Sequence, residues 1–94
     1  MVYTYIIIWI VYLTRKAHRQ LVKLPRFIQD LADLAVADLE EQGIHPQGWN
    51  TLKTDDDEYR LRLNYRYRMR YRVTDEQTLE IEVFYVGHRR EAYR

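Results

Sequence analysis

Apolar and polar residues alternate along residues 58–73 of this chain. Every odd position from Tyr59 to Val73 is aromatic or aliphatic, and arginine occupies positions 60, 62, 66, 68, 70 and 72. A period of two is typical of a strand with one buried face. Because the run is longer than an ordinary strand, we predict a break near Asn64 and Tyr65, with strands at about 58–63 and 66–73.

Two further strands are predicted near the ends of the chain. Residues 3–13 are rich in β-branched and aromatic side chains, which favour a buried strand. Residues 79–87 form the last strand, after a turn at 74–77. The apolar run near the start is roughly half as long as a bilayer-spanning helix and lacks the flanks of a signal peptide, so we expect no membrane segment.

Two helices are predicted after the first strand. Thr14 is a suitable N-cap for residues 15–24, where apolar side chains recur at helical spacing. Pro25 ends that helix and suits the start of the next, and Gly43 is a natural stop. The second helix carries an apolar stripe made of Phe27, Ile28, Leu31, Leu34, Ala35 and Leu39.

The order of these elements predicts the fold class. Residues 44–57 are expected to be a connecting loop, which gives the order β-α-α-β-β-β. Helices so closely joined should form an antiparallel hairpin. We therefore predict an α+β fold in which a two-helix hairpin packs on one face of a mostly antiparallel four-stranded sheet. The 94 residues suffice for one domain, residues 1–94.

Composition and charge narrow the functional classes. With 47% hydrophobic residues the chain is expected to be folded. The formal net charge is only +1, but acids gather at 30–41 and 55–58 whereas arginines gather at 60–72 and after position 88, an arrangement that can bind nucleic acid locally. The absence of cysteine excludes thiolate chemistry and fits a cytoplasmic protein. Because no three residues show metal-ligand spacing, we expect no metal and no cofactor.

The six arginines of the alternating segment are not expected to be equivalent. Their even positions face away from the helices. A short turn at 74–77 would place Arg72 near Glu80 and Arg70 near Glu82, as ion pairs across the ladder. These two arginines are therefore predicted to have a structural role.

Arg68 is predicted to differ from its neighbours. In the same register it lies in mid-strand opposite Phe84, with Arg66 near Val86, and neither arginine has an acid across the ladder. A solvated guanidinium without a carboxylate partner can receive a phosphate. Arg66 has no predicted role.

Other cations extend this basic face. Arg60 and Arg62 point the same way from the neighbouring strand, and the ending "GHRREAYR" adds Arg89, Arg90 and Tyr93. Phosphate contacts fix the register of a bound nucleic acid, and unpaired bases stack on aromatic side chains. RNA is therefore the predicted ligand.

Several short motifs in this order resemble one protein superfamily. They are "TRKAHRQLVKLP" after the first strand, "GWNTLK" in the loop, "EYRLRL" and "YRMRYRV" in the strands, and "VGHRREAYR" at the end. Residues 5–94 thereby resemble the RelE/ParE toxin superfamily of bacterial toxin–antitoxin systems and, within it, the RelE-like mRNA interferases. The resemblance implies a toxin that cuts mRNA in the ribosomal A site and forms a hetero-oligomer with a cognate antitoxin.

The resemblance also implies roles for the matched positions. Arg68 matches the family's transition-state arginine, and Arg89 matches a second catalytic arginine near the leaving group. Tyr93 matches a C-terminal tyrosine associated with proton transfer from the attacking 2′-hydroxyl. Arg60 and Arg62 match a basic pair that grips the RNA backbone.

Proton transfer has two candidates, His88 and Tyr93. A histidine, with an ordinary pKa of about 6.5, is the better acid or base, and in some branches of the superfamily a histidine in this region does such work. A tyrosine pKa lies near 10, although nearby arginines lower it. Packing of His88 at the strand end is an equally good interpretation. Since an efficient acid–base pair is missing, we expect the ribosome to align the mRNA.

Two other functions remain open. A ParE-like protein would inhibit DNA gyrase through protein contacts and would not be an enzyme. An inactive relic would only bind the antitoxin. The joint presence of Arg68, Arg89 and Tyr93 favours the nuclease, because ParE-type chains typically lack this set.

Overall fold

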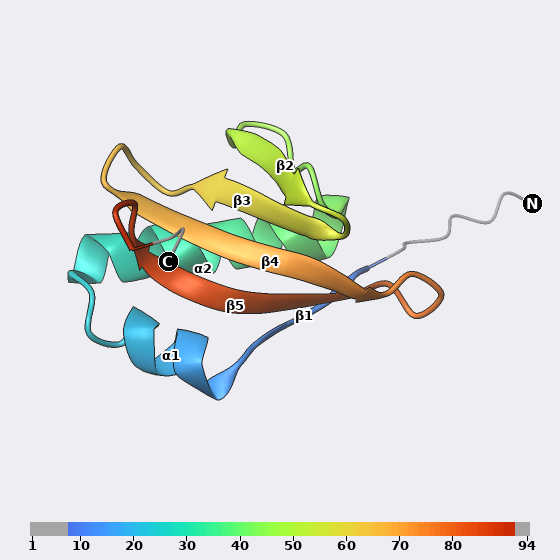
Figure 1. Cartoon of the computed structure of the whole chain (residues 1–94), viewed down its shortest axis with the longest axis horizontal. Coiled ribbons are helices and arrows are strands. Elements are labelled where there is room, and N and C mark those ends of the chain that lie inside the picture. The colour runs from blue at the N-terminus through green and yellow to red at the C-terminus, as the bar shows by residue number, and fades with distance from the viewer. Residues whose placement is uncertain (1–7, 92–94) are drawn as a thin grey trace, which may run out of the picture.

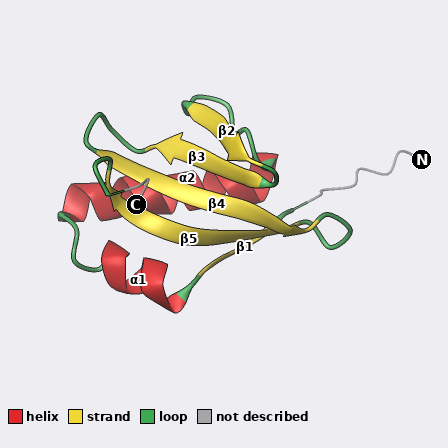
Figure 2. Ribbon diagram, in the orientation of Figure 1, coloured by secondary structure: helices red, strands yellow, loops and turns green. Residues whose placement is uncertain are grey.

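The two helices and the last three strands lie close to their predicted positions. The computed structural model describes residues 8–91 (Figure 1). Its elements are β1 (Ile10–Leu13), α1 (Arg15–Leu21), α2 (Arg26–Gln42), β2 (Thr51–Asp55), β3 (Glu58–Arg62), β4 (Tyr67–Asp75) and β5 (Glu80–His88). The predicted α+β class is confirmed, and Figure 2 shows α2 crossing behind the sheet with α1 beside β5.

The sheet has five strands, so the prediction of four was wrong. The strand order is β1-β5-β4-β3-β2, with β1 parallel to β5 and every other pair antiparallel. The additional strand is β2, within the segment predicted as a loop, and it forms the edge next to β3. Most of its side chains are exposed, so it lacks the apolar alternation that marks a half-buried strand. At the other edge, β1 begins at Ile10, and residues 3–7 of the predicted first strand lie outside the described residues.

The core lies between the helices and one face of the sheet. Most inward side chains of β3, β4 and β5 are almost fully buried, Tyr67 and Val73 are partly buried, and α2 contributes Ile28, Ala32, Ala35 and Leu39 to the same core. The stripe predicted for α2 was wrong at Phe27 and Leu34, which are exposed. These two residues are seven positions apart and share a side of the helix that is rotated away from the sheet.

The helix ends follow local hydrogen bonding. The Thr14 hydroxyl oxygen accepts a hydrogen bond from the Ala17 amide at 3.0 Å, which confirms the predicted N-cap. α1 ends at Leu21, three residues before the predicted end. The Gln29 side-chain amide donates to the Leu24 carbonyl at 2.9 Å and so ties α2 to the connection. The two helices run in opposite directions, as expected of a hairpin (Figure 1).

Gly43 ends α2 where the chain passes Trp9. Its backbone angles, φ 84° and ψ −154°, belong to a region that is nearly exclusive to glycine. A Cβ at this position would lie 2.8 Å from Nε1 of Trp9. The Trp9 amide also donates to the Glu40 carbonyl of α2 at 2.8 Å. The start of the sheet is therefore fixed to the end of α2 by contacts that leave no room for a side chain.

We expect Gly43→Ala to lower the free energy of unfolding by about 2 kcal/mol or more, because it combines an unfavourable backbone conformation with a clash. Gly48→Ala is the matched control: its φ is also positive, 89°, but nothing lies within 4 Å of the position of its Cβ. Gly48→Ala should therefore cost only about 1 kcal/mol. Equal losses in urea unfolding would contradict a role for the Trp9 contact.

Candidate functional site

The face of the sheet that points away from the helices carries most of the charged side chains of the strands. We call it the open face and define it by Glu58, Arg60, Arg62, Arg68, Arg70, Arg72, Glu82, Phe84 and Tyr85. The intervening residues of β3 and β4 are buried on the opposite face. The division of the alternating segment into a core face and an arginine face is therefore confirmed.

The predicted pairing of β4 with β5 was wrong. Arg72 lies opposite Glu82, Arg70 opposite Tyr85, and Arg68 opposite Gly87. The register shifts between Val73 and Asp75 and again between Arg70 and Tyr71, and each irregularity inserts an unpaired residue into one strand. Alternation alone does not reveal such bulges. The residue opposite Arg72 is therefore two positions later in β5 than predicted, and the residue opposite Arg68 is three positions later.

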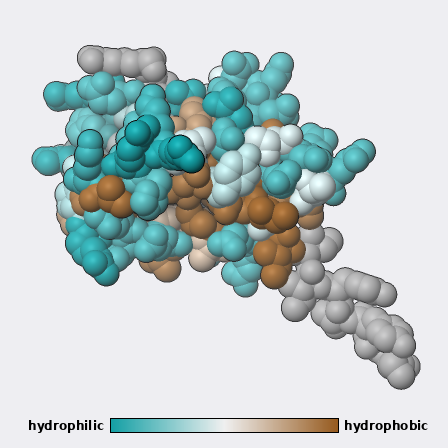
Figure 3. Space-filling view, turned by 90° about the horizontal axis from the view of Figure 1, so that it is seen from below, coloured by the Kyte–Doolittle hydropathy of each residue, from teal (hydrophilic) through white to brown (hydrophobic). Residues whose placement is uncertain are grey.

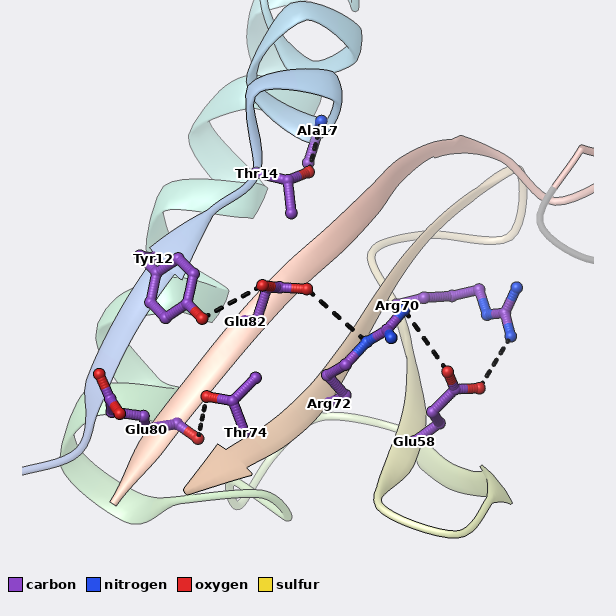
Figure 4. A network of polar contacts seen from close by, with 9 residues as sticks. All are labelled: Tyr12, Thr14, Ala17, Glu58, Arg70, Arg72, Thr74, Glu80 and Glu82. Atoms are coloured by element: carbon purple, nitrogen blue, oxygen red, sulfur yellow. Dashed lines mark hydrogen bonds and ion pairs between the residues drawn. The ribbon is translucent and has the colours of Figure 1, made fainter. Parts of the chain in front are cut away.

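Ion pairs occupy one end of the open face (Figure 4). Both carboxylate oxygens of Glu58 are used: one lies 3.6 Å from Arg70 and the other 3.5 Å from Arg72. Glu82 lies 3.7 Å from Arg72 and accepts a hydrogen bond from the Tyr12 hydroxyl at 3.1 Å. The prediction that Arg70 and Arg72 form sheet-face ion pairs is confirmed, but both predicted partners were wrong. Arg70 pairs with Glu58 instead of Glu82, and Arg72 pairs with Glu58 and Glu82 instead of Glu80.

Arginines face one another along the ladder between β3 and β4. Arg60 lies opposite Arg70, and Arg62 lies opposite Arg68. Like charges directly across a ladder are unfavourable. Arg60 and Arg70 are half-buried, whereas Arg62 is exposed, so a cation is available to solvent at the end of the face away from Glu58.

Arg68 is buried, with only 5% of its surface exposed. Its Nη1 donates to the carbonyl oxygen of Asn64 at 2.6 Å and to that of Tyr67 at 3.1 Å. It is the second residue of β4, so the prediction of a solvated cation in mid-strand was wrong. Arg68 fixes the loop between β3 and β4, and its predicted catalytic role stays a prediction.

The loop between β3 and β4 carries an exposed tyrosine that the alternating pattern did not predict. Tyr65 occupies an odd position, yet it is 58% exposed. Its hydroxyl accepts a hydrogen bond from Nε of Arg66 at 2.8 Å, which raises the pKa of that guanidinium. The guanidinium carbons of Arg66 and Arg89 lie 5.2 and 5.6 Å from the centre of the Tyr65 ring. The only sequence signal for this exposed ring is the predicted break near Asn64, because residues in a loop need not follow the buried and exposed alternation of a strand.

The loop between β3 and β4 is also hydrogen-bonded to the C-terminal turn, residues 89–91. The Arg89 amide donates to the Arg66 carbonyl at 2.7 Å. Arg62, Arg66, Arg68 and Arg89 are thereby brought to one end of the sheet, which we call the arginine end. Of these, Arg62, Arg66 and Arg89 are exposed.

His88 lies on the other side of the sheet from Arg68. It pairs with Tyr67 in the ladder, and their ring centroids are 5.8 Å apart. Its Nδ1 accepts a hydrogen bond from the Arg90 amide at 3.1 Å. Arg90 is exposed in the turn, and Tyr93 lies outside the described residues. His88 is thereby separated from Arg68, while it remains hydrogen-bonded to the turn that carries Arg90.

Tyr85 supports the C-terminal turn from the open face. Its hydroxyl donates to the His88 carbonyl at 2.8 Å. Burial raises the pKa of Tyr85, the Glu91 carboxylate raises it further, and Arg70 opposes both. A Cβ on Gly87 would lie 2.7 Å from the Tyr85 hydroxyl oxygen, so glycine at this position lets the tyrosine reach the turn.

Two features are absent from the described part of the chain. No helix within residues 8–91 is long and apolar enough to cross a membrane. Over the same residues, no three histidine, aspartate or glutamate side chains are grouped as metal ligands would be.

The fold is shared with small toxins that have been solved with their antitoxins. The RelE–RelB complex of Pyrococcus horikoshii OT3 matches with a TM-score of 0.73 and 22% identity over 89% of this chain and 98% of that chain. The RelBE2 complex of Mycobacterium tuberculosis matches with a TM-score of 0.65 and 26% identity over 87% and 99%. The E. coli RelBE complex matches with a TM-score of 0.66 and 18% identity over 84% and 94%.

The family itself follows from the sequence. The family model described as "ParE toxin of type II toxin-antitoxin system, parDE" matches residues 11–93. The chain therefore belongs to the ParE toxin family and to the RelE/ParE superfamily that its motifs predicted. A search of the curated proteins gave no match.

We expect Glu58→Gln to lower the free energy of unfolding by about 1 kcal/mol at low salt, because Arg70 and Arg72 then lose their shared carboxylate. Added salt should reduce this loss, since it screens the repulsion among the arginines. Asp30→Asn, which breaks the exposed pair with Arg26, is the control and should change stability little. Urea unfolding at two salt concentrations measures both, and a loss at Glu58 that does not respond to salt would argue against repulsion.

Proposed function

We propose that the protein is the toxin of a toxin–antitoxin pair and cleaves translated mRNA in the ribosomal A site. In this reaction the ribose 2′-hydroxyl attacks the adjacent phosphodiester, and the 5′-oxygen of the next nucleotide leaves. The observation that carries the proposal is the arginine end, where the C-terminal turn is hydrogen-bonded to the loop between β3 and β4. It concentrates cations where the family resemblance predicts the chemistry.

The exposed arginines are suited to bind and stabilise phosphate. A guanidinium offers planar, paired N–H donors that match phosphate oxygens. We assign the RNA backbone to Arg62, Arg60 and Arg90, and the charge that develops on the reacting phosphodiester to Arg89. Such electrostatic stabilisation needs no proton transfer from arginine itself. Tyr65, exposed beside Arg66 and Arg89, offers a ring on which a base can stack.

Arg68 has two tasks in this proposal. Through Nη1 it fixes the loop that carries Tyr65 and Arg66. The small part of its surface that stays exposed is what a phosphate would contact. Substitution of Arg68 is therefore expected to affect folding and cleavage together.

Proton transfer is assigned to Tyr93 in preference to His88. His88 packs against Tyr67 on the helix side and accepts a hydrogen bond from the turn, so its ring faces away from the phosphate that we place at the arginine end. Tyrosine is a weak base at neutral pH, even where nearby cations lower its pKa. Alignment of the mRNA by the ribosome would supply the missing rate enhancement.

A cognate antitoxin is the proposed partner within the cell. The solved relatives from P. horikoshii, M. tuberculosis and E. coli are toxin–antitoxin complexes. A segment with acidic side chains would neutralise the arginine end, and free toxin would be harmful to the cell that makes it.

Inhibition of DNA gyrase through protein contacts is the second candidate. The match to a ParE family model supports it, and so does the burial of Arg68, because a structural arginine needs no RNA. In that case the protein would not be an enzyme.

We expect the purified protein to cut mRNA on programmed ribosomes and to leave the same mRNA almost intact in their absence. Arg89→Gln should reduce the rate by about a hundredfold or more, as loss of a transition-state donor typically does. Arg26→Gln is the control, because Arg26 is exposed and paired with Asp30 in α2. Primer extension maps the cuts. A folded protein that cuts nothing but blocks DNA supercoiling by gyrase would establish the second candidate.

We expect Tyr93→Phe to slow cleavage on the ribosome much more than His88→Ala does. Loss of the histidine removes a ring contact and an acceptor for the turn, so a moderate effect through folding is expected. The pH profile of cleavage separates the two roles, since imidazole and phenol side chains change charge in different pH ranges. An inflection that persists in Tyr93→Phe and is lost in His88→Ala would transfer the proton-transfer role to His88.

A further inference from the structure

The peptide group between His88 and Arg89 is hydrogen-bonded on both sides. Its carbonyl oxygen accepts a hydrogen bond from the Tyr85 hydroxyl at 2.8 Å and another from the Glu91 amide at 3.0 Å. Its N–H donates to the Arg66 carbonyl at 2.7 Å. Because a peptide group is planar, bonds on both sides fix its orientation, and they thereby fix the point from which the Arg89 side chain starts.

This peptide group leads into a turn that is exposed to solvent. Arg89, Arg90 and Glu91 are all exposed. The end of β5 lies at the left of Figure 1, and the same side of the molecule, seen from below in Figure 3, is largely hydrophilic. Exposed segments with few buried apolar contacts open easily. The hydrogen bonds of the peptide group are therefore important for the order of this turn.

Tyr85 reaches the turn across Gly87, which makes room for it. A Cβ on Gly87 would lie 2.7 Å from the Tyr85 hydroxyl oxygen, and the next two nearest atoms, Cζ and Cε1, also belong to Tyr85. The positive-φ glycines of the described residues are Gly43 and Gly48, so the backbone at Gly87 does not itself require glycine. Glycine in a strand weakens it. The space needed by the phenol is thus the physical reason for glycine at this position.

Packing of the ring does not account for the hydroxyl of Tyr85. Phenylalanine would supply the same aromatic ring without a polar group that needs a partner. Burial raises the pKa of Tyr85, and the Glu91 carboxylate raises it further, although Arg70 opposes them. The hydroxyl therefore stays protonated at neutral pH and donates its proton to the carbonyl of the turn.

We propose that Tyr85 is a positioning residue for Arg89, and that its hydroxyl holds the peptide group from which the Arg89 guanidinium reaches the arginine end. That guanidinium lies 5.6 Å from the centre of the Tyr65 ring. The consequence for cleavage rests on the proposed function, in which Arg89 stabilises the charge of the reacting phosphodiester. A small displacement of such a group lowers the rate of reaction strongly.

The test is Tyr85→Phe, which removes the hydroxyl and keeps the ring. We expect hydrogen exchange of the Arg89 amide, followed by NMR, to become about threefold to tenfold faster. Cleavage on saturating programmed ribosomes should slow about tenfold, while the ribosome concentration that gives half the maximal rate stays unchanged. Tyr12→Phe is the matched control, because its hydroxyl also donates on the open face, to Glu82 at 3.1 Å. The control should change neither measurement.

A second variant and a double variant separate positioning from a general effect on folding. Gly87→Ala displaces the Tyr85 hydroxyl without removing it and should reproduce the faster exchange and the slower cleavage. In the background of Arg89→Gln, Tyr85→Phe should slow cleavage no further, because the residue through which it acts is already lost. An equal further loss in that background would overturn the proposal.

The exchange measurement decides the proposal independently of catalysis. Unchanged exchange of the Arg89 amide in both Tyr85→Phe and Gly87→Ala would overturn it. If the wild type cuts no mRNA, the proposed function fails, and faster exchange in the two variants still supports Tyr85 as the residue that positions Arg89.

Discussion

Repulsion among the arginines of the β3–β4 ladder is the constraint on which the open face depends. The antiparallel register sets Arg60 opposite Arg70 and Arg62 opposite Arg68, and such pairs are unfavourable in themselves. The face is stable because acceptors of two kinds are distributed along it. The Glu58 carboxylate lies beside Arg70 at one end, and backbone carbonyls receive Arg68 at the other. The exposed cations are those beyond the reach of the Glu58 carboxylate.

The two bulges in the β4–β5 ladder determine which part of the open face is ion-paired and which part forms the arginine end. Phe84 has no partner in β4, so Tyr85 lies opposite Arg70 and Gly87 opposite Arg68. Tyr85 can then bind the carbonyl at the start of the C-terminal turn, and the turn reaches the loop that Arg68 holds. A bulge of one residue thereby connects the ion-paired end of the sheet to the arginine end. The same residue serves packing as well, because the guanidiniums of Arg70 and Arg72 lie over the Phe84 ring at 5.1 and 4.0 Å.

Features of the structure that depend on a few neighbouring residues could be predicted from the sequence, and features that depend on distant residues could not. Alternation separated the two faces of β3 and β4, because it depends on neighbouring residues only. For the same reason Thr14 marked the start of α1, Pro25 the start of α2 and Gly43 its end, whereas the end of α1 was predicted three residues too late. β2 was missed since an exposed edge strand has no apolar period, and the β4–β5 register was missed since bulges do not alter composition. The partner of Arg68 was unpredictable for a related reason: backbone carbonyls in a loop leave no mark in the side-chain pattern. The superfamily was recognisable because motif order survives these local errors.

A nearly neutral protein with a basic end must carry acids elsewhere, and their position matters for recognition. Seven of the fourteen acids lie in α2 and in the turn between β2 and β3, and that turn precedes β3, whereas the arginine end lies at the other end of the same strand. Such segregation orients a protein in the field of a polyanion, whereas a uniform charge only attracts it. Under the proposed function, the arginine end would contact the RNA while the turn between β2 and β3 remains in solvent. The proposed RNA contact therefore depends on the distribution of charge more than on its total.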